Sequence, residues 1–189
     1  MDIFQALVLG IVQGLTELLP VSSSAHLFLI PWIFGWQEIG DFDVALHFGT
    51  LLAIGIFFFK DWIELIKGGY KQVVKKENST EGRMFWYIVI ATIPGGAIGF
   101  LLDHFAEDIL TNQFIIATAL IIMGIILYVV DKKSKSEVEY KDMTFKQTFL
   151  IGLSQALAFI PGVSRSGVTM TTARAMGVKR EAAAKYSFM

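Results

Sequence analysis

The chain has 189 residues, of which 54% are hydrophobic and 17% are charged, and its formal net charge is −1. About a quarter of the residues of a soluble domain are charged, so this composition excludes an ordinary soluble domain and indicates a polytopic membrane protein. The near-neutral balance leaves no basic face for nucleic acid. The chain has no cysteine, which excludes disulfides, thiolate metal sites and cysteine nucleophiles. The first residues are not basic, so we expect no secretory signal peptide.

Five apolar stretches are predicted to form membrane helices, in chain order 3–19, 44–59, 84–102, 114–130 and 149–160. A spanning helix needs about 20 residues, so the middle three can span with help from their flanks. The first and fifth are short, and each runs into a proline and a serine-rich turn before another apolar segment, 25–34 or 167–176. We interpret both as re-entrant helix hairpins, because irregular backbone at membrane depth must be buried in protein or line a wet cavity. The predicted fold is all-α, a single integral membrane domain over residues 1–189.

The charged residues predict the orientation. Residues 60–83 and 131–146, read as loops, contain six and five basic residues. The segments 35–43 and 103–108, also read as loops, contain no lysine or arginine and hold the acidic residues Glu38, Asp41, Asp43, Asp103, Glu107 and Asp108. Basic loops stay in the cytoplasm, so the two basic segments are predicted to be cytoplasmic and the two acidic ones external.

The two hairpins form an internal repeat. A shift of 142 residues gives seven identities over positions 5–26: Gln5 with Gln147, Gly10 with Gly152, Gln13 with Gln155, Leu15 with Leu157, Val21 with Val163, Ser22 with Ser164, and Ser24 with Ser166. Repeat 1 covers about 1–130 and repeat 2 starts at about 145. One copy enters from outside and the other from inside, which is the arrangement of an inverted-topology repeat with its site where the broken helices meet. The copies differ at Glu17, which aligns with Phe159, and at Ser23, which aligns with Arg165.

Glu17 is hard to explain as packing, since a carboxylate at the bilayer centre costs roughly 2.5–3.5 kcal/mol on insertion scales. The alternative is a glutamate at a helix end that reaches the membrane surface, because Pro20 follows closely. Gln13 lies four residues earlier and shares a helix face with Glu17. Intramembrane ionisable groups are functional by default, so we favour a functional Glu17.

Ser22, Ser23 and Ser24 lie at the predicted start of the next helix, where one of them is expected to act as the N-cap. Three hydroxyls and free backbone N–H groups also suit an anion. His26 follows four residues after Ser22 and is either a structural histidine or, as we favour, part of the site. His47 and Thr50 are weaker candidates, and the basic residues of 60–83 are expected to set the topology and to contact lipid headgroups.

The segment 161–169, of sequence PGVSRSGVT, carries the strongest signal. Arg165 lies at a helix start between Ser164 and Ser166, and a guanidinium offers the bidentate donors that suit phosphate oxygens. The alternative is a structural ion pair, with Glu17 as a partner. The glycines of the segment favour a binding site, because they let backbone approach an anion closely.

These motifs resemble the two signatures of the undecaprenyl-diphosphate phosphatases, the bacitracin-resistance proteins. Segments 13–26 and 161–169 carry the resemblance, and 47–50 and 184–188 are also similar to that family. Gln13 stands where the family often has glutamate. The resemblance implies hydrolysis of undecaprenyl diphosphate in the bacterial plasma membrane, and a divalent cation, Mg²⁺ or Ca²⁺. Family members are longer, so the chain is expected to be an N-terminal fragment with a truncated second repeat.

From these residues and the resemblance we assign roles. Arg165, Ser164, Ser166 and Thr169 are expected to hold the phosphates, together with Ser22 and Ser24. Glu17, aided by Gln13, either ligates the metal or acts as a base. Ser23 is the favoured nucleophile with His26 assisting, while attack by His26 or by water stays open. A polyprenyl-phosphate flippase and a lipid-binding scaffold are the alternatives. The expected partners are the lipid substrate and membrane lipid, with a homodimer left open.

Overall fold

The computed structural model describes residues 2–37, 40–106 and 112–189, and for 102–106 it describes the backbone alone. Every regular element in these ranges is a helix, apart from an isolated bridge between Val138 and Val178, which confirms the predicted all-α class. The helices are α1 (Ile3–Leu18), α2 (Ser23–Phe34), α3 (Gly40–Phe57), α4 (Phe59–Val74), α5 (Thr80–Ala106), α6 (Gln113–Lys133), α7 (Phe145–Ser154), α8 (Arg165–Ala175) and α9 (Arg180–Phe188), with 3₁₀ turns η1 (Tyr140–Asp142) and η2 (Gln155–Phe159).

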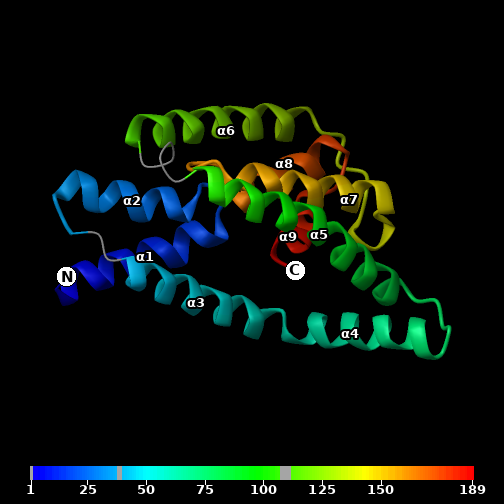
Figure 1. Cartoon of the computed structure of the whole chain (residues 1–189). Helices are drawn as coiled ribbons and strands as arrows, with labels where there is room; N and C mark the ends of the chain where they lie inside the picture. The colour runs from blue at the N-terminus through cyan, green and yellow to red at the C-terminus, as the bar shows by residue number, and fades with distance from the viewer. Residues whose placement is uncertain (1, 38–39, 107–111) are drawn as a thin grey trace.

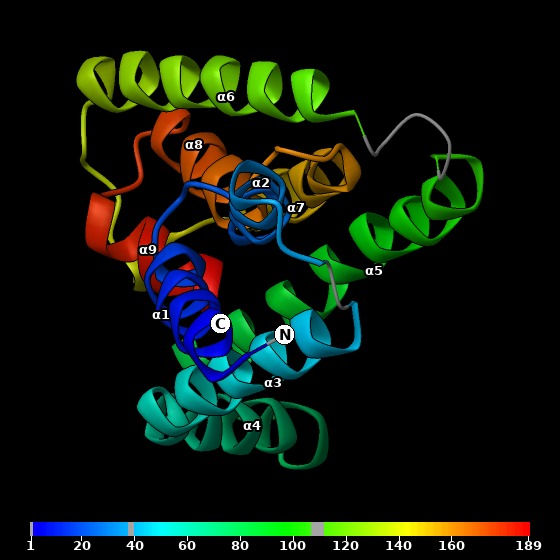
Figure 2. The ribbon, with the colours of Figure 1, turned by 90° about the vertical axis from the view of Figure 1, so that its left-hand side faces the viewer.

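Three of these helices are long and apolar enough to cross a membrane: Gly40–Phe57, Thr80–Leu101 and Gln113–Lys133. The segment Gly40–Phe57 has no buried share, and only 6% of Gln113–Lys133 is buried inside the protein. The apolar side chains of these two helices therefore face outward and suit lipid. In Figure 1, α6 lies along the upper edge and α3 with α4 along the lower edge, while α1, α2, α7 and α8 lie between them. Figure 2, a quarter turn away, shows the same order. The chain is therefore a polytopic membrane protein.

Both predicted hairpins are present, and both begin with the same cap. The Asp2 carboxylate accepts from the Gln5 backbone N–H, and the Gln5 side chain accepts from the Asp2 N–H. Thr144 and Gln147 repeat this capping box at the start of α7. Such a box satisfies two N–H groups that the first helical turn leaves free. The two boxes are separated by the repeat offset, so this pair of glutamines has one structural role. The inverted orientation of the repeats stays a prediction.

The structure moves several predicted boundaries. α3 begins at Gly40 instead of residue 44, because Asp41 and Asp43 fall in its first turn, where carboxylates stabilise a helix. α7 begins at Phe145 instead of residue 149 and changes to 3₁₀ geometry at Gln155. α5 continues through Pro94 as one helix.

The prediction of a loop over residues 60–83 was wrong. The segment forms α4 and the first turn of α5, which pack together through glycines. A Cβ on Gly68 would lie 2.6 Å from the backbone nitrogen of Gly82, and the Trp86 indole N–H donates to the carbonyl of Gly69. Charge density alone suggested a loop, but Lys60, Lys67 and Lys71 lie at helical spacing on an exposed side of α4, and only 75–79 lie between the two helices.

Asp41 and Asp43 belong to α3, and the backbone of 103–106 belongs to α5, so neither acidic segment is wholly a loop. The remaining acidic positions cannot be compared with the structure. Glu38, Glu107 and Asp108 lie outside the described residues, as do the side chains of Asp103 and His104. The orientation inferred from them stays a prediction.

A buried arginine joins the ends of α6 and α8. Arg174 is 3% exposed, and its guanidinium donates to the carboxylate of Asp131 at 2.7 Å and to the Ser136 hydroxyl and the Val178 carbonyl at 2.6 Å. Arg180 adds a second ion pair to Asp131. Since Arg174 uses its donors within the protein, it fixes α8 against α6 and so helps to hold the second hairpin in place.

Candidate active site

The turns of the two hairpins touch. α2 begins at Ser23 after the turn that ends α1, and α8 begins at Arg165 after η2. The Ser166 hydroxyl donates to the carbonyl of Leu19 at 3.5 Å. A Cβ on Gly167 would lie 3.2 Å from the Pro20 carbonyl oxygen. The glycine therefore lets the start of α8 come close to the backbone of the first turn, so the two motifs form one site.

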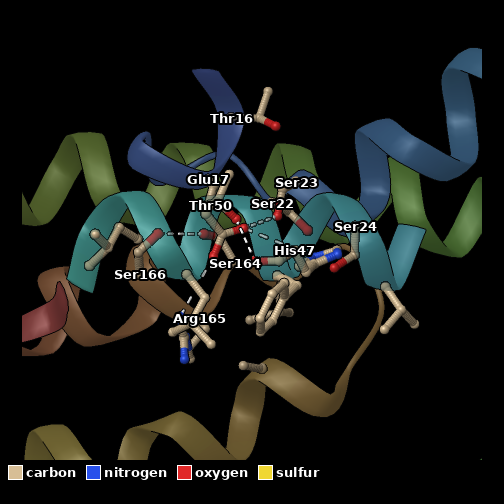
Figure 3. A pocket seen from close by; sticks show the side chains of 16 residues that line it. Thr16, Glu17, Ser22, Ser23, Ser24, His47, Thr50, Ser164, Arg165 and Ser166 are labelled. Atoms are coloured by element: carbon tan, nitrogen blue, oxygen red, sulfur yellow. Dashed lines mark hydrogen bonds and ion pairs between the residues drawn. The ribbon is translucent and has the colours of Figure 1, made fainter. Parts of the chain in front are cut away.

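Glu17, at the end of α1, lies at the centre of this site (Figure 3). One carboxylate oxygen, Oε2, accepts from the Ser23 hydroxyl at 2.6 Å and from the Gln13 amide at 3.1 Å, and it lies 4.0 Å from His47 Nε2. The other oxygen, Oε1, lies 3.6 Å from the Arg165 guanidinium. The Glu17 side chain is 16% exposed. The partly buried charge thus has hydrogen-bond donors on one oxygen and a cation beside the other.

A cavity of about 490 Å³ opens beside Glu17. Its polar lining comes from the two hairpin turns and from α3, and an apolar wall includes Phe48, Leu51 and Ile54 of α3. The lining includes seven of the predicted site residues: Glu17, Ser22, Ser23, Ser24, Ser164, Arg165 and Ser166. The Arg165 side chain is 58% exposed. The cavity therefore combines an available cation and hydroxyls with an apolar surface.

The start of α2 leaves donors available. Ser22 occupies the N-cap position with a φ of 62°, which is uncommon outside glycine. Its side chain makes no capping hydrogen bond. The hydroxyl and the first N–H groups of α2 can therefore meet an anion at a helix N-terminus.

The start of α8 uses its hydroxyls partly for itself. The Ser164 hydroxyl accepts from the Gly167 N–H at 3.0 Å, which makes it the N-cap, and it lies 3.1 Å from the Ser166 hydroxyl. The hydroxyl of Thr169 lies 2.6 Å from that of Ser187. Ser164 and Ser166 still line the cavity, whereas Thr169 does not.

Gln13 and His26 also lie outside the cavity lining. The His26 ring is 2.8 Å from the Ser22 carbonyl through Nδ1, and because a carbonyl only accepts, Nδ1 carries a proton. Gln13 is 1% exposed and its amide nitrogen donates to Glu17 and Thr50. Its amide oxygen is buried without a hydrogen-bond partner.

Two residues that the sequence ranked low belong to the cavity. His47 and Thr50 lie on α3 and line it. The His47 Nδ1–H donates to the carbonyl of Asp43 at 2.8 Å, which turns Nε2 toward Glu17. Their spacing could have indicated that they act together. Thr50 follows His47 by three residues, and residues at i, i+3 and i+4 share a helix face. The pairing of α3 with α1 could not be read from that spacing.

The site also has oxygen donors that suit a hard cation. Mg²⁺ binds one or two carboxylates together with substrate phosphates and water. The Glu17 carboxylate and the unpaired amide oxygen of Gln13 fit this donor type. Among the described residues no group of three His, Cys, Asp or Glu side chains could hold a metal. A metal ion held by Glu17 and Gln13 stays a prediction.

The chain is similar to known proteins over its whole length. A model of the family "Bacitracin resistance protein BacA" matches residues 6–189. An undecaprenyl-diphosphatase of Pelotomaculum thermopropionicum is 53% identical over the whole chain, which covers 70% of that relative. Proteins of the same name from Desulforudis audaxviator and Caldicellulosiruptor bescii are 50% and 49% identical over the whole chain, and the chain covers 71% of each.

Proposed function

Because the chain belongs to the bacitracin resistance protein BacA family, we infer that it hydrolyses undecaprenyl diphosphate to undecaprenyl phosphate and inorganic phosphate. This reaction returns the lipid carrier to cell-wall synthesis and confers resistance to bacitracin. Relatives at up to 53% identity carry the name undecaprenyl-diphosphatase. The bacterial plasma membrane is the proposed location, since the substrate is a membrane lipid and the chain has helices that can span one.

The observation that carries this function is the meeting of Glu17 and Arg165 in one cavity, 3.6 Å apart. A diphosphate on a long apolar tail needs a cation and hydroxyls for its head and an apolar surface for the first part of its tail. The cavity provides both kinds of wall. Phosphoryl transfer depends mainly on positioning and on charge neutralisation, which the proposed roles of Arg165 and the serines supply.

The contact between Ser23 and Glu17 supports Ser23 as the nucleophile. At 2.6 Å the hydroxyl donates to the carboxylate in a short, charge-assisted hydrogen bond. As the Ser23 oxygen bonds to the terminal phosphorus, its proton passes to Glu17 and the bond to the lipid phosphate breaks, so the lipid monophosphate leaves. In the second step Glu17 returns its proton to the Ser23 oxygen as water attacks the seryl phosphate and the bond between Ser23 and phosphorus breaks. The proton lost by the attacking water passes to solvent, and inorganic phosphate departs.

The phosphate contacts are assigned to groups that face the cavity. Arg165 is proposed to bind phosphate oxygens bidentately, with Ser22 and Ser24 from one turn and Ser164 and Ser166 from the other. Thr169 is a substrate contact in this proposal if its hydroxyl leaves Ser187.

The imidazoles are proposed to move protons. His26 assists Ser23 in this scheme, and His47 is added because its Nε2 faces Glu17. Direct attack by His26, or by a water that Glu17 activates, are the alternatives to a seryl phosphate.

A divalent cation, Mg²⁺ or Ca²⁺, would be held by Glu17 and Gln13 and would neutralise phosphate charge when bound. In that case the Gln13 amide oxygen gains the partner that it otherwise lacks.

Release of phosphate from undecaprenyl diphosphate tests the function directly. The purified protein in detergent should release inorganic phosphate, and a chelator should stop the release until Mg²⁺ or Ca²⁺ is restored. Lipid movement across vesicles without phosphate release would instead support the flippase. Binding without either activity would support a lipid-binding scaffold.

A further inference from the structure

α4 carries an apolar stripe that no other helix of the described chain covers. Its members follow one another at alternating steps of four and three residues, so they share one face of the helix. Their exposed fractions run from 36% to 62%, and they are Phe59, Ile63, Ile66, Tyr70 and Val73. Leu65, Gly68 and Gly69 are buried on the other side of the helix, where Gly68 and Gly69 approach α5. We call the five exposed residues the α4 stripe.

Lysines border the α4 stripe. Lys60, Lys67 and Lys71 are exposed, and at 100° per residue they lie along one edge of it. Within the described ranges none of the three forms an ion pair. The acidic Asp61 is instead paired with Lys185 of α9. Glu64, Glu77 and Glu81 line a surface hollow with Lys67 and Lys71, but no described carboxylate lies within ion-pair distance of the three lysines, so their ammonium groups are available to headgroups.

The start of α4 has the aromatic residues and the lysine that are typical of helices at a membrane surface. α3, a candidate span, ends at Phe57, and α4 begins at Phe59. Phe57 and Phe59 are 80% and 62% exposed, with Lys60 and Trp62 next in the chain. Aromatic side chains and lysines gather where a membrane helix meets the headgroups, and lysines favour the cytoplasmic side. In the predicted orientation, the beginning of α4 lies at the cytoplasmic surface of the bilayer.

We propose that α4 is a lipid-binding helix, whose stripe inserts among the lipids of the cytoplasmic leaflet while Lys60, Lys67 and Lys71 contact anionic headgroups. An apolar face bordered by lysine is the pattern of helices that bind at a membrane interface. A second copy of the chain is a poorer occupant, because α4 follows directly after a candidate membrane span, where lipid is the neighbour. An anionic leaflet brings the opposite charge.

The lysines set the size of the expected effect. A lysine near an anionic surface contributes about 1 kcal/mol, so replacing one should lower the ratio of inserted to free α4 about fivefold. Three replacements should lower it by about a hundredfold. The stripe itself would still favour lipid over water, so the dependence on headgroup charge is the specific readout.

The absence of cysteine makes the test direct. Ile66→Cys carries a fluorescent probe on the stripe, and Glu64→Cys, exposed on the same helix away from the stripe, is the matched control. Each protein is reconstituted in vesicles of phosphatidylcholine, or of phosphatidylcholine with phosphatidylglycerol, that contain a brominated lipid. Quenching by the brominated lipid should be strong at residue 66 and weak at 64, and should increase with phosphatidylglycerol. Lys60→Gln, Lys67→Gln and Lys71→Gln together should remove that increase.

Three results would overturn the proposal. Iodide in the water could quench both positions equally, which would place the stripe in water. Quenching by lipid could be independent of phosphatidylglycerol and of the lysines, which would leave no headgroup recognition. The Ile66→Cys protein could also cross-link to a second copy in vesicles, which would make α4 a dimer contact. Retained phosphatase activity shows that the lysine variant is folded, because α4 supplies no residue to the cavity.

Discussion

Replacing Arg165 by lysine keeps the positive charge and removes the planar fork of donors. The guanidinium lies 3.6 Å from Glu17 and is 58% exposed, so its ion pair with Glu17 contributes at most about 1 kcal/mol to stability. The Arg165→Lys protein should therefore melt close to the parent in the absence of substrate. Its activity should fall much more, because a lysine cannot bind a phosphate through two parallel hydrogen bonds.

The size of the loss follows from one hydrogen bond. A charge-assisted hydrogen bond contributes about 1.5–3 kcal/mol, and a factor of ten in rate is about 1.4 kcal/mol. Arg165→Lys should thus lower kcat/KM about ten- to more than a hundredfold, and Arg165→Ala should lower it further. Arg174→Lys is the matched control, since that arginine is buried and bound within the protein. It should lower the melting temperature while the folded fraction keeps its activity.

The assay is phosphate release from undecaprenyl diphosphate in detergent, with thermal melting followed on the same samples. Near-normal activity of Arg165→Lys would refute the bidentate contact. If Arg165→Ala loses activity only in proportion to a lower melting temperature, the residue is structural. The reasoning also fails if Arg165 and Arg174 respond alike.

Three further changes test the site and the packing. Glu17→Gln should abolish turnover while the protein still inserts, because an amide can neither take a proton nor offer a full charge to a metal; a purified, folded variant with near-normal rate would contradict this. His26→Asn and His47→Asn should both lower kcat, His47→Asn by more, since of the two only His47 lines the cavity; the reverse order would restore His26 as the main proton carrier. Gly152→Ala should destabilise the protein by about 1–3 kcal/mol, because the added Cβ would lie 2.6 Å from the Cβ of Ala91 in α5. Gly124→Ala is the control, since its added Cβ meets open space, and it should leave the melting temperature unchanged or higher.

The sequence predicted the class of fold, and seven of the residues that it singled out line one cavity. Composition showed a membrane protein, and proline followed by serines marked both turns. Glu17 and Arg165 were singled out because ionisable groups are costly in an apolar segment. The structure brings both to one cavity with Ser23.

The sequence could not give the contacts between distant helices. His47 was ranked low because its importance depends on α3 lying beside α1, which no local pattern reveals. Thr169 was expected to face the phosphates, yet its hydroxyl is turned to Ser187 of α9. The loop predicted over 60–83 failed for another reason, since charge was counted without its helical spacing. The chemical character of each motif could be predicted from the sequence, whereas the contacts between helices could be seen only in the folded protein.

The contact between Ser166 and Leu19 joins residues 147 positions apart, and this separation sets an order of events during synthesis. The hairpin of α1 and α2 enters the membrane first and brings Glu17 with it, before Arg165 has been made. Until then the carboxylate has the donors of its own hairpin, Ser23 and Gln13, and the His47 ring of α3. Insertion of α8 then supplies the cation and closes the cavity in the same step. The proposed phosphate-binding centre is therefore incomplete in the nascent chain until its second half arrives.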